Sequence, residues 1–176
     1  MGATQWMYFT EYDTEPDRAL HRLREEVFRE GSYRRPWEFP DILSGLYQLP
    51  SLGWGARLKL WAIESLFTTI ELVRWAFWGF RRPSSVDEAV AWAGEDGTHS
   101  IMDVERTGMY RAEGVAFPLS EPRLRSLFGT DRPTRETVEE KADELACSLA
   151  RGEAVYFAVY HDGGPREIAF FGVSGD

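Results

Sequence analysis

The stretch GEDGTHSIMDVE, residues 94–105, gathers carboxylate, imidazole and hydroxyl groups in one short segment. Asp96, His99 and Asp103 could do acid–base chemistry there, because a carboxylate within reach of an imidazole orients the ring for proton transfer. Loops that lead into strands carry function more often than the elements they connect. Asp96, His99 and Asp103 are therefore the candidate catalytic residues of this sequence.

The same segment has a simpler interpretation as turn chemistry. Residues 95–97, Glu-Asp-Gly, favour a turn, and the hydroxyls of Thr98 and Ser100 can satisfy its backbone groups. The remaining histidines, His21 and His161, form no metal-binding pair at positions i and i+4. Turn chemistry is the favoured interpretation of the segment, and neither a metal nor another cofactor is expected.

Other signals of catalysis are missing from the sequence. It contains no G-x-S-x-G elbow, phosphate loop or dinucleotide fingerprint. The single cysteine, Cys147, stands beside an apolar helical stripe, so we expect a buried and inert thiol. An enzyme is therefore not the favoured class.

The most unusual segment is residues 53–83, GWGARLKLWAIESLFTTIELVRWAFWGFRRP. As a helix from about residue 56 to 80 it presents an apolar stripe broad enough to lie on a sheet. Trp61 and Trp75 fall on the opposite side, where polar residues are expected. The segment holds five Lys and Arg against two Glu, so it is locally basic inside an acidic protein.

Three interpretations of this amphipathic helix remain open. Helices that are apolar nearly all round are usually buried inside their own domain. Tryptophan and arginine also dominate interface hot spots, which favours a protein partner or self-association. Adsorption to a membrane surface is the third and weakest interpretation. The candidate binding residues are Trp54, Trp61, Arg74, Trp75 and Trp78.

The bulk composition is that of a folded acidic protein. The 176 residues hold 29 Asp and Glu against 20 Lys and Arg, a formal net charge of −9, and 43% of them are hydrophobic. Nucleic-acid binders usually present a positive face, so DNA or RNA is not an expected partner. Charges interrupt every apolar window, so no transmembrane segment is expected. One cysteine and no secretory signal favour a cytoplasmic location.

The pattern of residues predicts alternating strands and helices. Residues 6–12 are β-rich, and residues 14–31 predict a helix with a capping box at Thr14 and Asp17 and a stop at Gly31. Three prolines predict an irregular connector over 32–52. The remaining expected elements are a helix over 85–94, strands at 100–108 and 110–118 turning at Gly108, a helix over 133–152 and a hairpin over 155–173.

This order of elements predicts a single α+β domain, residues 1–176, in which three or four helices pack on a mainly antiparallel sheet of about five strands. Alternate residues of the last hairpin are apolar on both sides, so its strands are expected to be covered on both faces.

Two function hypotheses follow. The first is a non-catalytic cytosolic protein-interaction domain, for example an immunity-like or antitoxin-like inhibitor or scaffold of a basic protein partner. The alternative is a small enzyme or ligand-binding domain with an aromatic pocket next to the 94–105 loop, lined by Trp61, Trp75 and Trp78, with His99 and Asp103 as its polar groups.

Overall fold

The computed structural model of the chain describes residues 4–33, 83–94 and 97–174. The chain divides into two units, residues 1–34 with 85–176, and residues 35–84. The predicted helix at about 56–80 and the predicted connector at 32–52, beyond Tyr33, lie outside the described residues. All the described helices and strands belong to the first unit.

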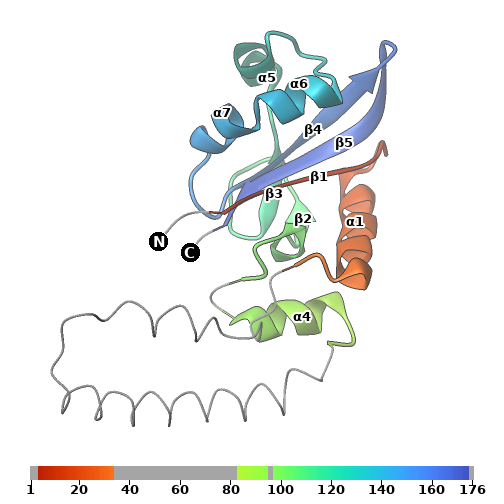
Figure 1. Ribbon diagram of the computed structural model, residues 1–176, viewed down its shortest axis with the longest axis vertical. Helices are drawn as coiled ribbons and strands as arrows, with labels where there is room; N and C mark the ends of the chain where they lie inside the picture. Colours follow the sequence, from red (N-terminus) through yellow and green to blue (C-terminus); the bar gives the residue numbers. More distant parts are fainter. Residues whose placement is uncertain (1–3, 34–82, 95–96, 175–176) are drawn as a thin grey trace, which may run out of the picture. The chain divides into compact units, whose positions relative to one another are not determined.

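A five-stranded mixed sheet organises this unit, with strand order β1-β5-β4-β3-β2 (Figure 1). The β1–β5 and β5–β4 pairs are antiparallel, whereas β4–β3 and β3–β2 are parallel. The strands are β1 (Gln5–Glu11), β2 (Arg106–Thr107), β3 (Val115–Pro118), β4 (Ala154–His161) and β5 (Gly164–Val173). The α+β class is confirmed, but the prediction of a mainly antiparallel sheet is wrong. Three helices separate β3 from β4, and such a crossover returns the chain for a parallel strand.

The predicted hairpin over residues 100–118 is also wrong. Ile101–Asp103 forms a 3₁₀ turn, η2, and β2 is only two residues long. The Ser100 hydroxyl accepts a hydrogen bond from the backbone N–H of Met102 at 3.2 Å. Such local side-chain bonds compete with a strand ladder. Residues 108–114 then form a loop that leads to a parallel β3, so Gly108 is not a hairpin turn.

Helices cover both faces of the sheet (Figure 1). Helices α1 (Pro16–Glu30) and α4 (Val86–Ala93) pack on one face, with α5 (Glu121–Phe128), α6 (Arg135–Glu140) and α7 (Ala142–Cys147) on the other. The described residues thus hold five helices where three or four were predicted. Helix α5 was not predicted, and the helix predicted over 133–152 is divided at Lys141, where φ is −104° and ψ is 12°.

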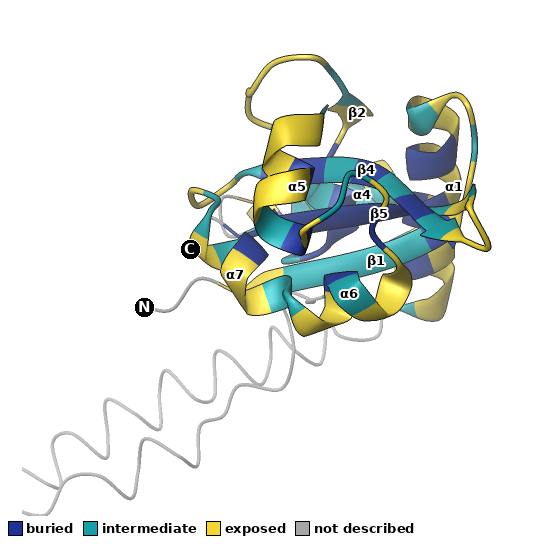
Figure 2. Cartoon of the chain, turned by 90° about the horizontal axis from the view of Figure 1, so that it is seen from above, coloured by how far each residue is buried: buried dark blue, intermediate teal, exposed yellow. Residues whose placement is uncertain are grey.

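The two-sided core confirms the prediction for the last hairpin. On β4 the side chains of Val155, Phe157 and Val159 enter the cluster under α5–α7. Tyr156 packs against the opposite cluster, under α1 and α4. Figure 2 shows how buried residues concentrate along the central strands. Because β5 and β4 are covered on both faces, surfaces for binding must lie at the sheet edges, on the outer helix faces or in the loops.

Some of the helix-end signals predicted from the sequence are confirmed, and one is wrong. Gly31 ends α1 in the left-handed conformation at φ 74°, and the Ser85 hydroxyl caps α4 by accepting from Glu88 N–H at 3.2 Å, as predicted. The capping box predicted at Thr14 is wrong, because Glu15 occupies the N-cap and makes no side-chain cap bond. Asp17 instead binds β2, which a local pattern does not reveal.

The fold contradicts the expectation of a buried Cys147. Cys147 is exposed rather than buried, because α7 turns Leu145 inward and leaves the cysteine on the solvent side. Among the described helices none has the length and apolar character needed to cross a bilayer.

Candidate functional site

The candidate catalytic loop is built around the carboxylate of Asp103. Its Oδ1 accepts hydrogen bonds from the backbone N–H of Thr98 at 2.7 Å and from the Thr98 hydroxyl at 2.8 Å. The Thr98 and Ser100 hydroxyl oxygens lie 2.8 Å apart, and both residues are fully buried. Gly97, at φ 69°, brings its Cα so close that an added Cβ would lie 3.0 Å from Asp103 Oδ2. The Asp103 carboxylate therefore organises this loop, where turn chemistry by the Thr98 and Ser100 hydroxyls was expected.

The structure describes two of the three predicted catalytic residues, His99 and Asp103. His99 is half-buried at φ 52°, a left-handed conformation that is uncommon outside glycine. Within the described residues the hydrogen bonds of Asp103 go to Thr98, so its carboxylate is engaged in holding the loop. Asp96 lies outside the described residues. The loop thus shows a structural role for Asp103, and the acid–base role of His99 and Asp96 stays a prediction.

A buried arginine next to this loop was missed by sequence analysis. Arg24 on α1 is only 8% exposed, and its Nη2 donates to the Met102 carbonyl oxygen at 3.2 Å. Its Nε is buried without a hydrogen-bond partner. Burial lowers the pKa of Arg24, while the charges of Asp87, Glu105 and Asp103 act in the opposite direction. A buried polar atom without a hydrogen-bond partner is costly, and Arg24 Nε is the one such side-chain atom found among the described residues.

Tyr8 of β1 faces the same side of the sheet as Arg24. The Tyr8 hydroxyl donates to the Ser32 carbonyl oxygen at 3.4 Å. Burial raises the pKa of Tyr8, and the negative charges of Asp103 and Glu30 raise it further. The phenol therefore stays protonated at neutral pH and acts as a hydrogen-bond donor. The charge of Asp103 therefore acts on both Tyr8 of β1 and Arg24 of α1.

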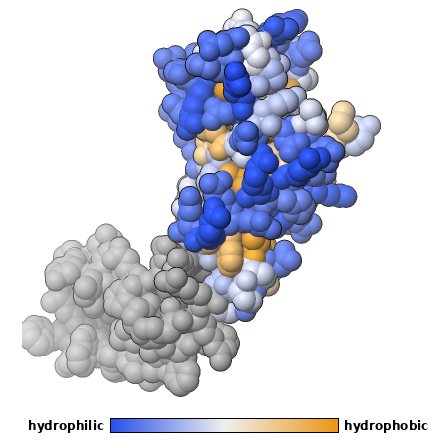
Figure 3. All heavy atoms as spheres, turned by 90° about the vertical axis from the view of Figure 1, so that its right-hand side faces the viewer, coloured by the Kyte–Doolittle hydropathy of each residue, from blue (hydrophilic) through white to orange (hydrophobic). Residues whose placement is uncertain are grey.

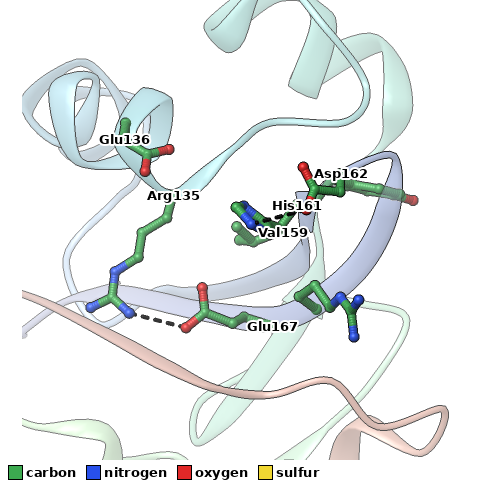
Figure 4. A pocket seen from close by; sticks show the side chains of 8 residues that line it. Arg135, Glu136, Val159, His161, Asp162 and Glu167 are labelled. Carbon is green, nitrogen blue, oxygen red and sulfur yellow. Dashed lines mark hydrogen bonds and ion pairs between the residues drawn. The ribbon is translucent and has the colours of Figure 1, made fainter.

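A surface groove lies at the other end of the sheet, between the β4–β5 turn and α6 (Figure 4). It has a volume of about 520 Å³ and is lined by Arg135, Glu136, Val159, Tyr160, His161, Asp162, Arg166 and Glu167. The Glu136 carboxylate accepts hydrogen bonds from the Glu136 backbone N–H and from the Thr134 side chain, and these bonds lower the pKa of Glu136. The groove is therefore a charged, open surface and differs from the enclosed apolar pockets that hold most small ligands.

The charges in this groove are largely paired with one another. Arg135 contacts Glu139 and Glu167, each at 3.0 Å, and its guanidinium lies 4.3 Å from the centre of the Phe9 ring. His161 Nε2 lies 3.2 Å from an Asp162 carboxylate oxygen, and both side chains are strongly exposed. Among the described residues no group of His, Cys, Asp and Glu could hold a metal ion.

The outer edge of β1 carries backbone groups that point away from the sheet. The Ser174 N–H donates to the Thr4 carbonyl oxygen, and the Tyr12 N–H donates to the Arg166 carbonyl oxygen. These two bonds show which alternate residues of β1 are hydrogen-bonded to β5. Even-numbered residues of β1 therefore bond to β5, and the N–H and C=O groups of Gln5, Met7 and Phe9 face outward. At the end of this edge Arg22 Nη2 donates to the outward carbonyl oxygen of Glu11 at 3.0 Å.

Acidic helices accompany this edge. Helices α6 and α7 run alongside β1, from the Arg135–Phe9 contact to a hydrogen bond from Gln5 Nε2 to Asp143 Oδ1 at 3.1 Å. Residues 135–147 hold five Asp and Glu against two Lys and Arg. The outward-facing edge of β1 therefore has a negatively charged border.

The opposite edge carries the largest exposed apolar side chains among the described residues. Met109 is 74% exposed and Tyr110 is 84% exposed, in the loop between β2 and β3. The loop is held at its base, because Arg111 pairs with Glu153 at 2.9 Å and stacks on the Phe117 ring. An exposed loop that presents Met and Tyr is a suitable contact for another protein.

Comparison with known proteins does not extend this picture, since no family model, curated protein or solved structure matches the chain. The predicted binding residues Trp54, Trp61, Arg74, Trp75 and Trp78 all lie outside the described residues. A signal for Arg24 was present in the sequence, because it interrupts the apolar stripe of α1 between Leu20 and Val27. The open edge of β1 had no local signal, since it depends on the strand order.

Proposed function

We propose that this chain is a non-catalytic cytosolic protein-interaction domain, an immunity-like or antitoxin-like inhibitor or scaffold that binds a basic protein partner. The observation that most strongly supports this proposal is the excess of negative charge on the described residues. The described residues hold 22 Asp and Glu against 13 Lys and Arg, so their formal charge equals the −9 of the whole chain. A field of this size accelerates encounter with a positively charged partner and discourages binding to nucleic acid.

The surface supports this proposal. Hydrophilic side chains cover most of the face in Figure 3, with smaller apolar patches between them. Interfaces need desolvated anchors in addition to charge. Met109 and Tyr110 provide exposed anchors, and the tryptophans at positions 54, 61, 75 and 78 remain proposed anchors from the sequence.

The test begins with the native protein. It is purified from its own source at low salt, and co-purifying proteins are identified by mass spectrometry. We expect a protein of basic pI whose association rate falls as ionic strength rises. Replacing Glu136 and Glu140 by Lys should slow association by about tenfold while dissociation changes little. Retrieval of only acidic or neutral partners, with no dependence on salt, would contradict the proposal.

The alternative is a small ligand-binding domain or enzyme beside residues 94–105. One observation favours it: the Nε of Arg24 is buried without a hydrogen-bond partner, and Asp103 acts electrostatically on the same guanidinium. A buried polar atom without a partner calls for an explanation, and a catalytic or ligand-binding role is one such explanation. Arg24→Met keeps the volume and removes the charge, so it should be at least as stable as the parent protein, by up to about 1 kcal/mol. If Arg24→Met also binds the native partner normally, Arg24 serves something else, which favours the alternative.

A further inference from the structure

We propose that the open edge of β1 is the docking site for an extended segment of the basic partner, which adds to the sheet as a sixth strand. This inference deepens the proposed function and rests on it for the nature of the partner. It is carried by the outward backbone groups of Gln5, Met7 and Phe9 together with the acidic border along the same strand.

The edge has the properties that strand addition requires. β1 pairs with β5 in continuous register over seven residues, without a bulge, proline or lysine that would discourage a new strand. Trp6, Met7, Tyr8 and Phe9 are all half-buried, so an added strand would cover apolar surface as well as bond to the backbone. Main-chain hydrogen bonds give affinity in this mode of recognition, and alternate side chains give specificity.

Charge identifies the kind of strand that fits. Side chains of an added strand alternate between the two faces of the sheet. One set would lie beside α6 and α7, where Glu139 is paired with Arg135 and Glu144 with Lys141. The excess of five Asp and Glu over two Lys and Arg, a net charge of −3 that Glu136, Glu140 and Asp143 supply, favours Lys and Arg. The other set would lie beside Trp6 and Tyr8, whose rings stand 6.0 Å apart and favour apolar partners. The fitting segment therefore alternates basic and apolar residues.

A second copy of the chain is a less suitable occupant. Two copies would bring together two domains of net charge −9, and they would place two acidic borders along the shared edge. Such self-repulsion opposes association, most strongly at low ionic strength. A basic strand meets no such cost.

The probe is a labelled seven-residue peptide in which Lys alternates with Val, and its binding to the full-length protein is followed by fluorescence anisotropy. Two control peptides replace Lys by Glu, or carry N-methyl groups on every amide while keeping the Lys side chains. We expect the Lys peptide to bind at least tenfold more tightly than either control. Equal binding of the N-methylated peptide would overturn strand addition, since only charge attraction would remain. No binding of the Lys peptide would overturn the inference as well.

Matched protein variants locate the site. Met7→Pro removes an outward N–H without removing a bond to β5, whereas Met7→Leu keeps that N–H. We expect peptide binding to weaken about tenfold in Met7→Pro, the equivalent of one hydrogen bond of about 1.4 kcal/mol, and less than twofold in Met7→Leu. Hydrogen exchange at the amides of Trp6 and Tyr8 checks that Met7→Pro retains the sheet. If the sheet is lost, protection of the Met7 and Phe9 amides by the peptide in the parent protein decides instead, and its absence would overturn the inference.

The experiment separates this inference from the proposed function. If a basic native partner binds Met7→Pro as well as the parent protein, the edge is not its site, and the inference fails while the function stands. If the peptide binds as expected but no basic protein co-purifies, the function fails and the edge remains a strand receptor. Sedimentation at several concentrations tests whether the edge instead binds a second copy of the chain. A dimer that is lost in Met7→Pro would assign the edge to self-association and overturn the inference of a basic partner.

Discussion

At one edge of the sheet β1 offers seven residues in continuous register, whereas at the other β2 offers only two. The β2 edge is also closed chemically, because Asp17 Oδ1 accepts from the Thr107 backbone N–H at 2.6 Å and from its hydroxyl at 2.8 Å. Natural proteins shorten or cap edge strands to prevent unwanted pairing. One edge here follows that rule and the other does not, and this difference supports the proposal that β1 receives a further strand.

Amide hydrogen exchange gives the largest expected contrast. In the free protein the amides of Trp6, Tyr8 and Thr10 bond to β5 and should exchange about a thousandfold more slowly than those of Met7 and Phe9. The Thr107 amide should also be protected, because Asp17 accepts from it. NMR exchange measured residue by residue tests this alternation. Uniform slow exchange along β1 would mean that its edge is already occupied.

A side chain added at Gly172 should disturb the packing of β1 against β5. An added Cβ would overlap the Trp6 indole, which leaves no room for relaxed packing. We expect Gly172→Ala to lower the free energy of unfolding by about 2 kcal/mol, as overpacking does. Chemical denaturation measures the loss. Gly163→Ala in the β4–β5 turn shows the effect of backbone strain without crowding, because an added Cβ there meets no atom within 4 Å.

Removing the cap of the β2 edge should have a smaller effect on stability. Asp17→Ala leaves the Thr107 N–H and hydroxyl without their carboxylate, and the loss is expected to be about 1.5 kcal/mol. Glu26→Ala, on the exposed face of the same helix, is the matched control and should be near neutral. If both variants unfold at the same denaturant concentration, the carboxylate does not hold the edge.

The smallest expected effect concerns acid stability at the border of β1. The pKa of Glu136 is lowered below its ordinary value of 4.5 by hydrogen bonds to its carboxylate. A depressed pKa stabilises the folded state at pH above 4.5, and this contribution is lost as the pH falls through the folded-state value. The difference between the parent protein and Glu136→Gln should therefore be constant near neutral pH and shrink below pH 4.5. A difference that grows on acidification would reverse the assigned sign.

The sequence predicted the local parts of this fold better than the relations between them. Helix signals at Ser85 and Gly31 and the two-sided apolar pattern of β4 depend on neighbouring residues, and they were predicted correctly. The direction of β3 depends on a helical crossover, and the edge position of β1 depends on pairing with a strand at the other end of the sequence. The spacing of apolar residues along the sequence indicates neither the direction of β3 nor the edge position of β1.

The candidate site divides in the same way. The use of the Ser100 hydroxyl to satisfy local backbone was predicted, whereas the Asp103 carboxylate, predicted as a catalytic group, accepts from the Thr98 N–H. The cap that Asp17 places on Thr107 joins positions 90 residues apart, whereas the sequence pattern predicted a helix cap. The burial of Arg24 follows from packing of α1 against η2, which composition does not specify.

The bond between Thr4 and Ser174 spans 170 positions in the chain. At about 5 to 20 residues per second, a ribosome needs roughly 10 to 30 seconds to make that interval. During synthesis β1 has no partner strand until β5 has been made, so the sheet is completed late. Topologies with such high contact order fold slowly, and chaperone dependence in the nascent chain is the expected cost of joining these ends.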